Sequence, residues 1–263
     1  MKNSLRFAFL LVLLAPALAW GQAGFDGTWK VDISKVQFPS KPDEFLLQNG
    51  MYQCKTCEPP LNIKADGQDQ PVAGTPYFDT MAVKETGNNT IEVTQKKNGK
   101  VVGTGKTTVS PDGGTLTIEF TNSGLPTGGP VSGKFEETRV AQGPAGSNAI
   151  SGSWRPTKLE GMNESALIFT FKLQGDTLSF STPTGQSYAA KLDGTEAPYT
   201  GDPGTTNVSV KRLDKNTLEE TDKRDGKVIS VSRITLAPDG KSLNISSEDK
   251  QQGTTTTFTA VRQ

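Results

Sequence analysis

Hydrophobic and polar residues alternate along most of this chain with a period of two. In segment 115–120, Leu116, Ile118 and Phe120 share one face, while Thr and Glu residues occupy the other. Segments 166–173 and 208–210 behave similarly. A period of two is typical of strands that bury one face of a sheet, and no stretch after residue 23 shows a convincing helical stripe. The pattern therefore predicts an all-β protein.

Turn residues separate these predicted strands at short intervals. Asn98-Gly99 and Asp225-Gly226 are typical of two-residue hairpins, in which both positions adopt positive φ angles. The Pro-Asp-Gly segments at 111–113 and 238–240 predict slightly longer turns. Strands joined by hairpins form an antiparallel meander, which hides its edges best by closing on itself. We therefore expect up-and-down barrels of about eight or nine strands each.

The chain carries this pattern twice. Three segments recur with a common offset of 127 residues: 89–92 as 216–219, 96–101 as 223–228, and 110–113 as 237–240. A common offset indicates duplication, so we expect two tandem domains, a first copy at 24–141 and a second copy at 148–263. Residues 142–147, rich in Gly, Pro and Ser, are typical of a short linker.

Residues 1–23 have a different composition from the rest of the chain. Two basic residues precede an apolar run over 7–14 and two small-residue sites that end at Ala19 and Ala23. This order is typical of a cleavable signal peptide, and the run is shorter than the roughly 20 residues that a membrane-spanning helix needs. We expect cleavage after Ala19 or Ala23 and a mature protein that is periplasmic or extracellular, without stable membrane insertion.

Charge and composition exclude several functions. The chain has 28 basic and 28 acidic residues, and the two signs are interspersed. No basic surface for phosphates is expected, so nucleic acid is excluded as a partner. The sequence contains no histidine, which removes Ser-His-Asp and Cys-His catalysis and the commonest zinc and copper sites. We therefore expect neither an enzyme nor a metal or other cofactor.

Carboxylates are the remaining candidates for acid and base chemistry. Glu92 recurs as Glu219, beside Glu220. In the alternating pattern Glu92 points away from the apolar Ile91 and Val93, so we expect its side chain to face solvent.

The motif Gly27-x-Trp29, repeated as Gly152-x-Trp154, resembles the Gly-x-Trp signature of the lipocalins. Lipocalins pack this Trp beneath an Arg of the last strand at the closed end of the barrel. Each copy here ends with a Phe and an Arg four residues apart, which are Phe135 with Arg139 and Phe258 with Arg262. The Asp-Gly, Pro-Tyr and Ser-Pro-Asp-Gly segments between the predicted strands also resemble those of secreted bacterial lipocalin-like (calycin-type) proteins. Without a recognisable C-terminal helix, fatty-acid-binding-like and avidin-like barrels fit as well.

The resemblance implies a monomer that binds a small hydrophobic ligand in one or both barrels. The inward-facing residues expected to contact it are Phe169, Phe171, Phe180, Val208 and Val210 in the second copy, and Ile91, Val93, Leu116, Ile118 and Phe120 in the first. Filled barrels would instead indicate a non-catalytic structural or interaction module of the cell envelope.

Two repeated segments, 66–79 and 193–203, are the longest irregular ones, and each contains a Pro-Tyr. Such loops either cover a cavity mouth or complete the core. Tyr77 and Tyr199 are therefore expected to contact ligand from a lid, or to belong to a plug.

The two cysteines, Cys54 and Cys57, have the spacing of a redox dithiol or of half a zinc site. Zinc would need two further Cys or His ligands, which the chain does not have. A redox dithiol needs a helix N-terminus, whereas residues 50–52 predict a strand. We therefore expect a disulfide that closes a turn outside the cytoplasm.

Overall fold

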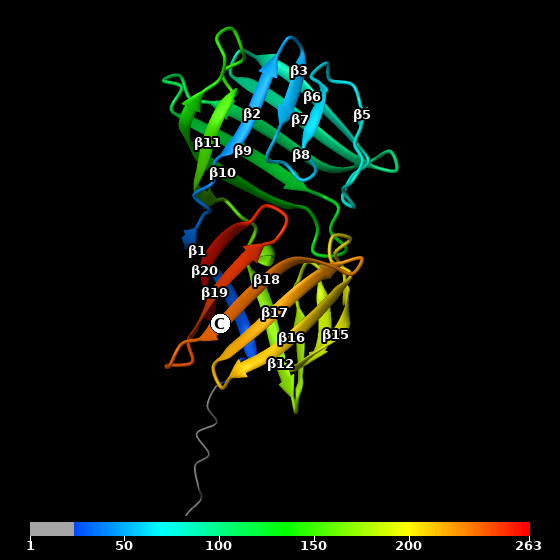
Figure 1. The fold of residues 1–263 in the computed structure, drawn as a ribbon, viewed down its shortest axis with the longest axis vertical. Coiled ribbons are helices and arrows are strands. Elements are labelled where there is room, and N and C mark those ends of the chain that lie inside the picture. The colour runs from blue at the N-terminus through cyan, green and yellow to red at the C-terminus, as the bar shows by residue number, and fades with distance from the viewer. Residues whose placement is uncertain (1–23) are drawn as a thin grey trace, which may run out of the picture.

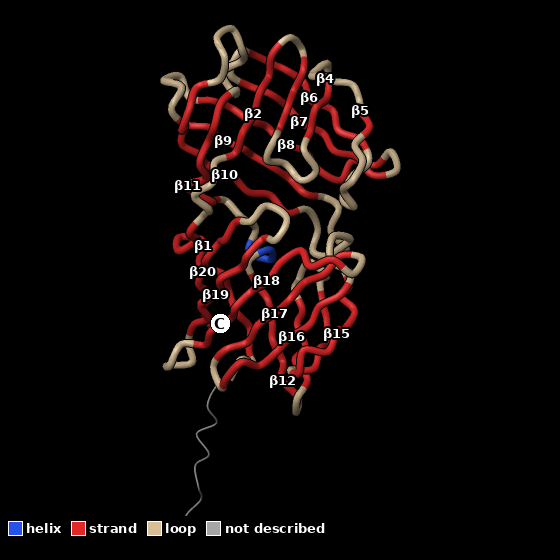
Figure 2. The backbone as a smooth tube through the Cα atoms, in the orientation of Figure 1, coloured by secondary structure: helices blue, strands red, loops and turns tan. Residues whose placement is uncertain are grey.

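The computed structural model describes residues 24–263, and these are almost entirely strand (Figure 2). The expected signal peptide, 1–23, lies outside the described residues. Twenty strands and one 3-10 helix, Glu164–Ala166, form two ten-stranded antiparallel sheets that follow one another along the long axis (Figure 1). The predicted all-β barrel architecture is confirmed. Each sheet has more strands than expected because short segments of the irregular regions also pair.

The N-terminal barrel has the strand order β4-β3-β2-β11-β10-β9-β8-β7-β6-β5. Its strands are β2 (Asp43–Gln48), β3 (Met51–Cys54), β4 (Leu61–Lys64), β5 (Gln70–Pro71), β6 (Thr80–Gly87), β7 (Thr90–Lys97), β8 (Lys100–Val109), β9 (Thr115–Asn122), β10 (Val131–Gln142) and β11 (Gly152–Glu160). Asp66, just after β4, forms an isolated bridge with Lys84 of β6, so this sheet is nearly closed.

The C-terminal barrel is fully closed. Its strands are β1 (Gly27–Gln37), β12 (Ile168–Gln174), β13 (Thr177–Ser181), β14 (Ser187–Lys191), β15 (Asp193–Thr200), β16 (Asn207–Asp214), β17 (Thr217–Arg224), β18 (Lys227–Leu236), β19 (Ser242–Asp249) and β20 (Thr254–Arg262). β1 closes the barrel by pairing with β12 on one side and with β20 on the other.

Each barrel takes its first strand from the other copy. β1 of the first copy lies in the C-terminal barrel, and β11 of the second copy pairs with β2 and β10 in the N-terminal barrel. The predicted domains 24–141 and 148–263 therefore describe the duplication in sequence, but the folded barrels are not contiguous in sequence. The exchange is possible because β1 and β11 carry the same Gly-x-Trp pattern, so each strand can take the other's place.

Two buried tryptophans mark one end of each barrel, here called the closed end. Each indole nitrogen donates to a backbone carbonyl four residues earlier, at 3.0 Å for Trp29 and 2.8 Å for Trp154. The guanidinium carbon of Arg262 lies 4.2 Å from the ring centroid of Trp29, and that of Arg139 lies 3.8 Å from Trp154. The contact implied by the lipocalin resemblance is present. Each Arg nevertheless meets the Trp of the other copy, because the first strands are exchanged.

The opposite ends of the two barrels, here called the mouths, meet in the middle of the molecule (Figure 1). Loop 123–130 of the N-terminal barrel reaches loop 182–186 of the C-terminal barrel. The backbone nitrogen of Thr127 donates to the carbonyl of Thr184 at 3.4 Å, and its hydroxyl donates to the carbonyl of Pro183 at 3.0 Å. This contact places the interior of each barrel close to the junction between them.

Candidate functional site

The interior of the N-terminal barrel contains a partly enclosed cavity of about 250 Å³. Its lining is mostly apolar and includes Phe45, Tyr52, Ile91, Val93, Ile118 and Phe120. Four of the five residues expected to contact a ligand in the first copy line this cavity. The fifth, Leu116, is fully buried and packs in the surrounding core.

Glycine creates part of this space. In the register of the sheet, Gly105 of β8 lies between Val93 of β7 and Phe120 of β9. The matching position in the second copy is Ser232, whose hydroxyl donates to Ser247 at 2.9 Å. The first copy has no side chain at this inward-facing position, so the cavity remains open.

A buried carboxyl group lies one layer deeper than the cavity, toward the closed end. Glu137 of β10 faces inward opposite Leu116, is 3% exposed, and its Oε2 atom has no hydrogen-bond partner among the described residues. Burial, and then the charge of Asp43, raise the pKa of Glu137 to about 8. Glu137 is therefore mostly protonated at neutral pH and can donate a hydrogen bond.

Tyr52 connects this carboxyl group with the cavity. It lines the cavity, and burial followed by the charges of Glu137 and Asp43 raises the pKa of its hydroxyl. The hydroxyl therefore stays neutral and can donate or accept a hydrogen bond. The cavity combines apolar walls with neutral polar groups on one side.

The interior of the C-terminal barrel is occupied by aromatic side chains. Phe169, Phe171, Phe180, Tyr188 and Tyr199 pack with ring centroids 5.0 to 6.3 Å apart. Next to them, the expected ligand contacts Val208 and Val210 are fully buried in the core. The residues that were expected to contact a ligand in the second copy therefore pack against one another.

Two carboxylates lie among these aromatic rings: Glu220, one of the carboxylates considered from the sequence, and Asp222, which was not. Tyr188 donates its hydroxyl hydrogen to Glu220, and Ser230 donates to Oδ2 of Asp222 at 2.7 Å. Burial, and then the charge of Asp222, raise the pKa of Glu220 to about 8; burial also raises the pKa of Asp222. Because side chains alternate along β17, the apolar Leu218 was the signal that Glu220 and Asp222 face inward.

The two tyrosines of the repeated irregular segments have different surroundings. Most of 193–203 forms strand β15, and Tyr199 packs in the aromatic cluster, as a plug would. Tyr77 remains 49% exposed, and its hydroxyl lies against Gly204 of the second copy. Burial, and then the charge of Asp202, raise the pKa of Tyr77 to about 12. Tyr77 belongs to the first copy, which forms most of the N-terminal barrel. Its side chain nevertheless contacts the mouth of the C-terminal barrel.

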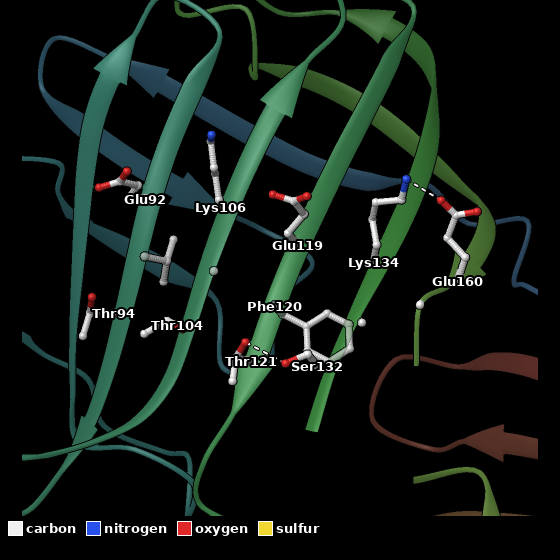
Figure 3. A pocket seen from close by; sticks show the side chains of 14 residues that line it. Glu92, Thr94, Thr104, Lys106, Glu119, Phe120, Thr121, Ser132, Lys134 and Glu160 are labelled. Atoms are coloured by element: carbon white, nitrogen blue, oxygen red, sulfur yellow. Dashed lines mark hydrogen bonds and ion pairs between the residues drawn. The ribbon is translucent and has the colours of Figure 1, made fainter. Parts of the chain in front are cut away.

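A broad depression of about 790 Å³ lies on the outer face of the N-terminal barrel (Figure 3). A row of alternating charges crosses it in direct register: Glu92, Lys106, Glu119, Lys134 and Glu160. Glu92 is exposed, as predicted. Exposed pairs of this kind contribute only about 0–1 kcal/mol each. Each charged side chain already lies beside one of opposite charge on the neighbouring strand. This surface is therefore a weaker candidate for a binding site than the inner cavity.

The predicted disulfide between Cys54 and Cys57 is confirmed, at the end of β3. Cys57 also lines the cavity of the N-terminal barrel. A structural disulfide fits a protein outside the cytoplasm. Among residues 24–263, no helix is long and apolar enough to cross a membrane.

No protein-family model matches the chain, and neither a curated protein nor a solved structure does. The inference of function therefore depends on the cavity and on the residues that surround it.

Proposed function

We propose that the protein binds a small, mostly apolar molecule inside the N-terminal barrel and carries or stores it outside the cytoplasm, as a lipocalin-like protein would. The observation behind this proposal is the apolar cavity of about 250 Å³. An apolar cavity of about 150 Å³ is large enough to hold benzene. A single ring with a short side chain, or a short alkyl chain, therefore fits the available volume.

The polar groups beside the cavity are neutral. Tyr52 lines it and keeps its hydroxyl hydrogen, and Glu137, one layer deeper, is mostly protonated. Because none of the lining residues carries a charge, the cavity favours a mostly apolar ligand.

The packed interior of the C-terminal barrel supports a different role for that half. Its aromatic cluster fills the space in which a ligand was expected. The proposal therefore assigns ligand binding to the N-terminal barrel and a structural role to the C-terminal one.

Native mass spectrometry tests this function. The mature protein, purified from its own exported fraction, is expected to carry a small molecule that leaves on mild denaturation. Val93→Phe fills the cavity and should prevent the bound mass, whereas Val101→Phe makes the same change at an exposed position and should retain it. A bare polypeptide mass for the wild type, together with no uptake of any added apolar compound, would contradict the proposal.

A further inference from the structure

A second cavity, of about 400 Å³ and open to solvent on one side, lies between the mouths of the two barrels. Both copies line it, with Phe120, Asn122 and Leu125 on one side and Gln186, Tyr199 and Asp202 on the other. The contact of Thr127 with Pro183 and Thr184 holds the two sides together. This cavity is therefore part of the folded molecule and depends on the junction between the barrels.

Phe120 lines both this cavity and the one inside the N-terminal barrel. The Phe120 ring packs over Gly133 of β10, beside the sulfur of Met162, and stacks on Phe135 with ring centroids 5.6 Å apart. The two cavities thus meet at a single side chain, whose rotation would connect them. A ligand that displaces this ring can occupy both.

The two cavities have different chemistry. The one between the mouths has hydroxyl, amide and carboxylate groups in its lining, and Asp202 carries the one charge among the lining residues. Behind it, the Oδ1 atom of Asp222 is buried without a hydrogen-bond partner among the described residues. Arg224, the cation on this side, donates to Gln251 at 2.8 Å. Asp202 is the one lining residue that accepts hydrogen bonds without donating any, and it carries the one charge, so the complementary group donates hydrogen bonds and carries positive charge.

We propose that the ligand is an amphipathic amine, with its apolar tail in the N-terminal barrel and its amino group between the two mouths, near Asp202. This inference rests on the function proposed above and adds the chemical class of the ligand. At roughly 30 Å³ for each methylene group, close to the volume of a liquid water molecule, the inner cavity holds about eight carbons.

Isothermal titration calorimetry with octylamine, 1-octanol and octanoate tests the amino group. Octylamine is expected to bind about tenfold more tightly than octanol, because a charged hydrogen bond to Asp202 is stronger than a neutral one, and octanoate should bind most weakly. Shortening the amine should weaken binding about fourfold for each methylene removed.

Asp202→Asn isolates the charge. Oδ1 of Asp202 accepts from the backbone nitrogen of Gly204 at 2.7 Å, an interaction that Asn preserves; Oδ2 accepts from the Thr205 hydroxyl at 3.4 Å, and that hydroxyl can accept from the Asn amide instead. The variant should lose the preference for octylamine over octanol. Asp193→Asn is a matched control, because Asp193 caps a turn by accepting from Thr195 at 2.8 Å but does not line the cavity. It should keep the preference.

Val93→Phe separates this proposal from the general one. If this variant binds none of the probes and the wild type shows no preference among the three head groups, the proposal of an amine ligand is wrong. The proposal that the inner cavity binds an apolar molecule is then retained. If the folded variant binds all three as the wild type does, both proposals are wrong. Ile118→Phe, at another lining position, replaces Val93→Phe if circular dichroism shows that the first variant does not fold.

Discussion

At the scale of single residues, the most unusual groups are acids that the barrels enclose. Glu137 and Glu220 both have a pKa raised to about 8, chiefly by burial. Buried acids reduce stability wherever the unfolded chain is ionised and the folded one is not. Their retention in the interior therefore gives the stability of this protein a defined dependence on pH.

Glu137→Gln should reduce this pH dependence. An unfolded Glu loses its proton near pH 4.3, whereas folded Glu137 holds it up to about pH 8, so the wild type loses stability as the pH rises between these values. We expect the variant to gain roughly 1–3 kcal/mol relative to the wild type at pH 8 and much less at pH 5. Urea unfolding at both values measures this difference. Glu92→Gln, at an exposed position, should leave the slope unchanged.

Arg139 provides a second test at this scale. Beyond its contact with Trp154, it donates to the backbone carbonyls of Gly113, Ser151 and Ala149 at 2.5, 2.9 and 2.7 Å. Lys cannot reach three acceptors with this geometry. We expect Arg139→Lys to cost about 2 kcal/mol or more in the free energy of unfolding, measured with denaturant. A cost below about 0.5 kcal/mol, typical of an exposed charge, would contradict this role.

At the scale of elements, the sequence predicted most strands, because period-two alternation and turn residues such as Asn98-Gly99 fix them locally. It did not predict the exchange of β1 and β11. Both strands have the Gly-x-Trp pattern and bury the same residues, so the sequence contains no signal for which barrel accepts which strand. Glu137, in contrast, could have been recognised, because it lies between Phe135 and Arg139 on the face already assigned to the interior.

Removal of β1 should therefore damage the distant barrel. A chain that begins at residue 38 lacks the strand between β12 and β20. We expect faster amide hydrogen exchange in those two strands and little change in β7 to β9. A synthetic peptide of residues 24–37 should restore protection by adding the missing strand, whereas the same peptide with Trp29→Ala should not. Loss of protection in the N-terminal barrel alone would contradict the observed pairing.

At the scale of the whole molecule, duplication has produced two barrels of one architecture with different interiors. Gly105 and Val93 leave space in the first copy, whereas Ser232 and Glu220, at the matching positions, fill it with polar groups in the second. The exchange of strands then ties the open barrel to the packed one and fixes the cavity between their mouths. In the function proposed above, the packed barrel forms one side of the ligand site.

This interlocking can be tested by cutting the chain between the copies. Residues 144–146 are exposed, so a protease site inserted there should be cleaved in the folded protein. We expect the two fragments to co-elute from size-exclusion chromatography without denaturant, because each contributes a strand to the other's barrel. They should separate only after unfolding. If the barrels instead matched the two contiguous copies, surface contacts alone would join them, such as those of loop 123–130, of Tyr77 and of Gln252 with Thr56, and dilution would separate the fragments.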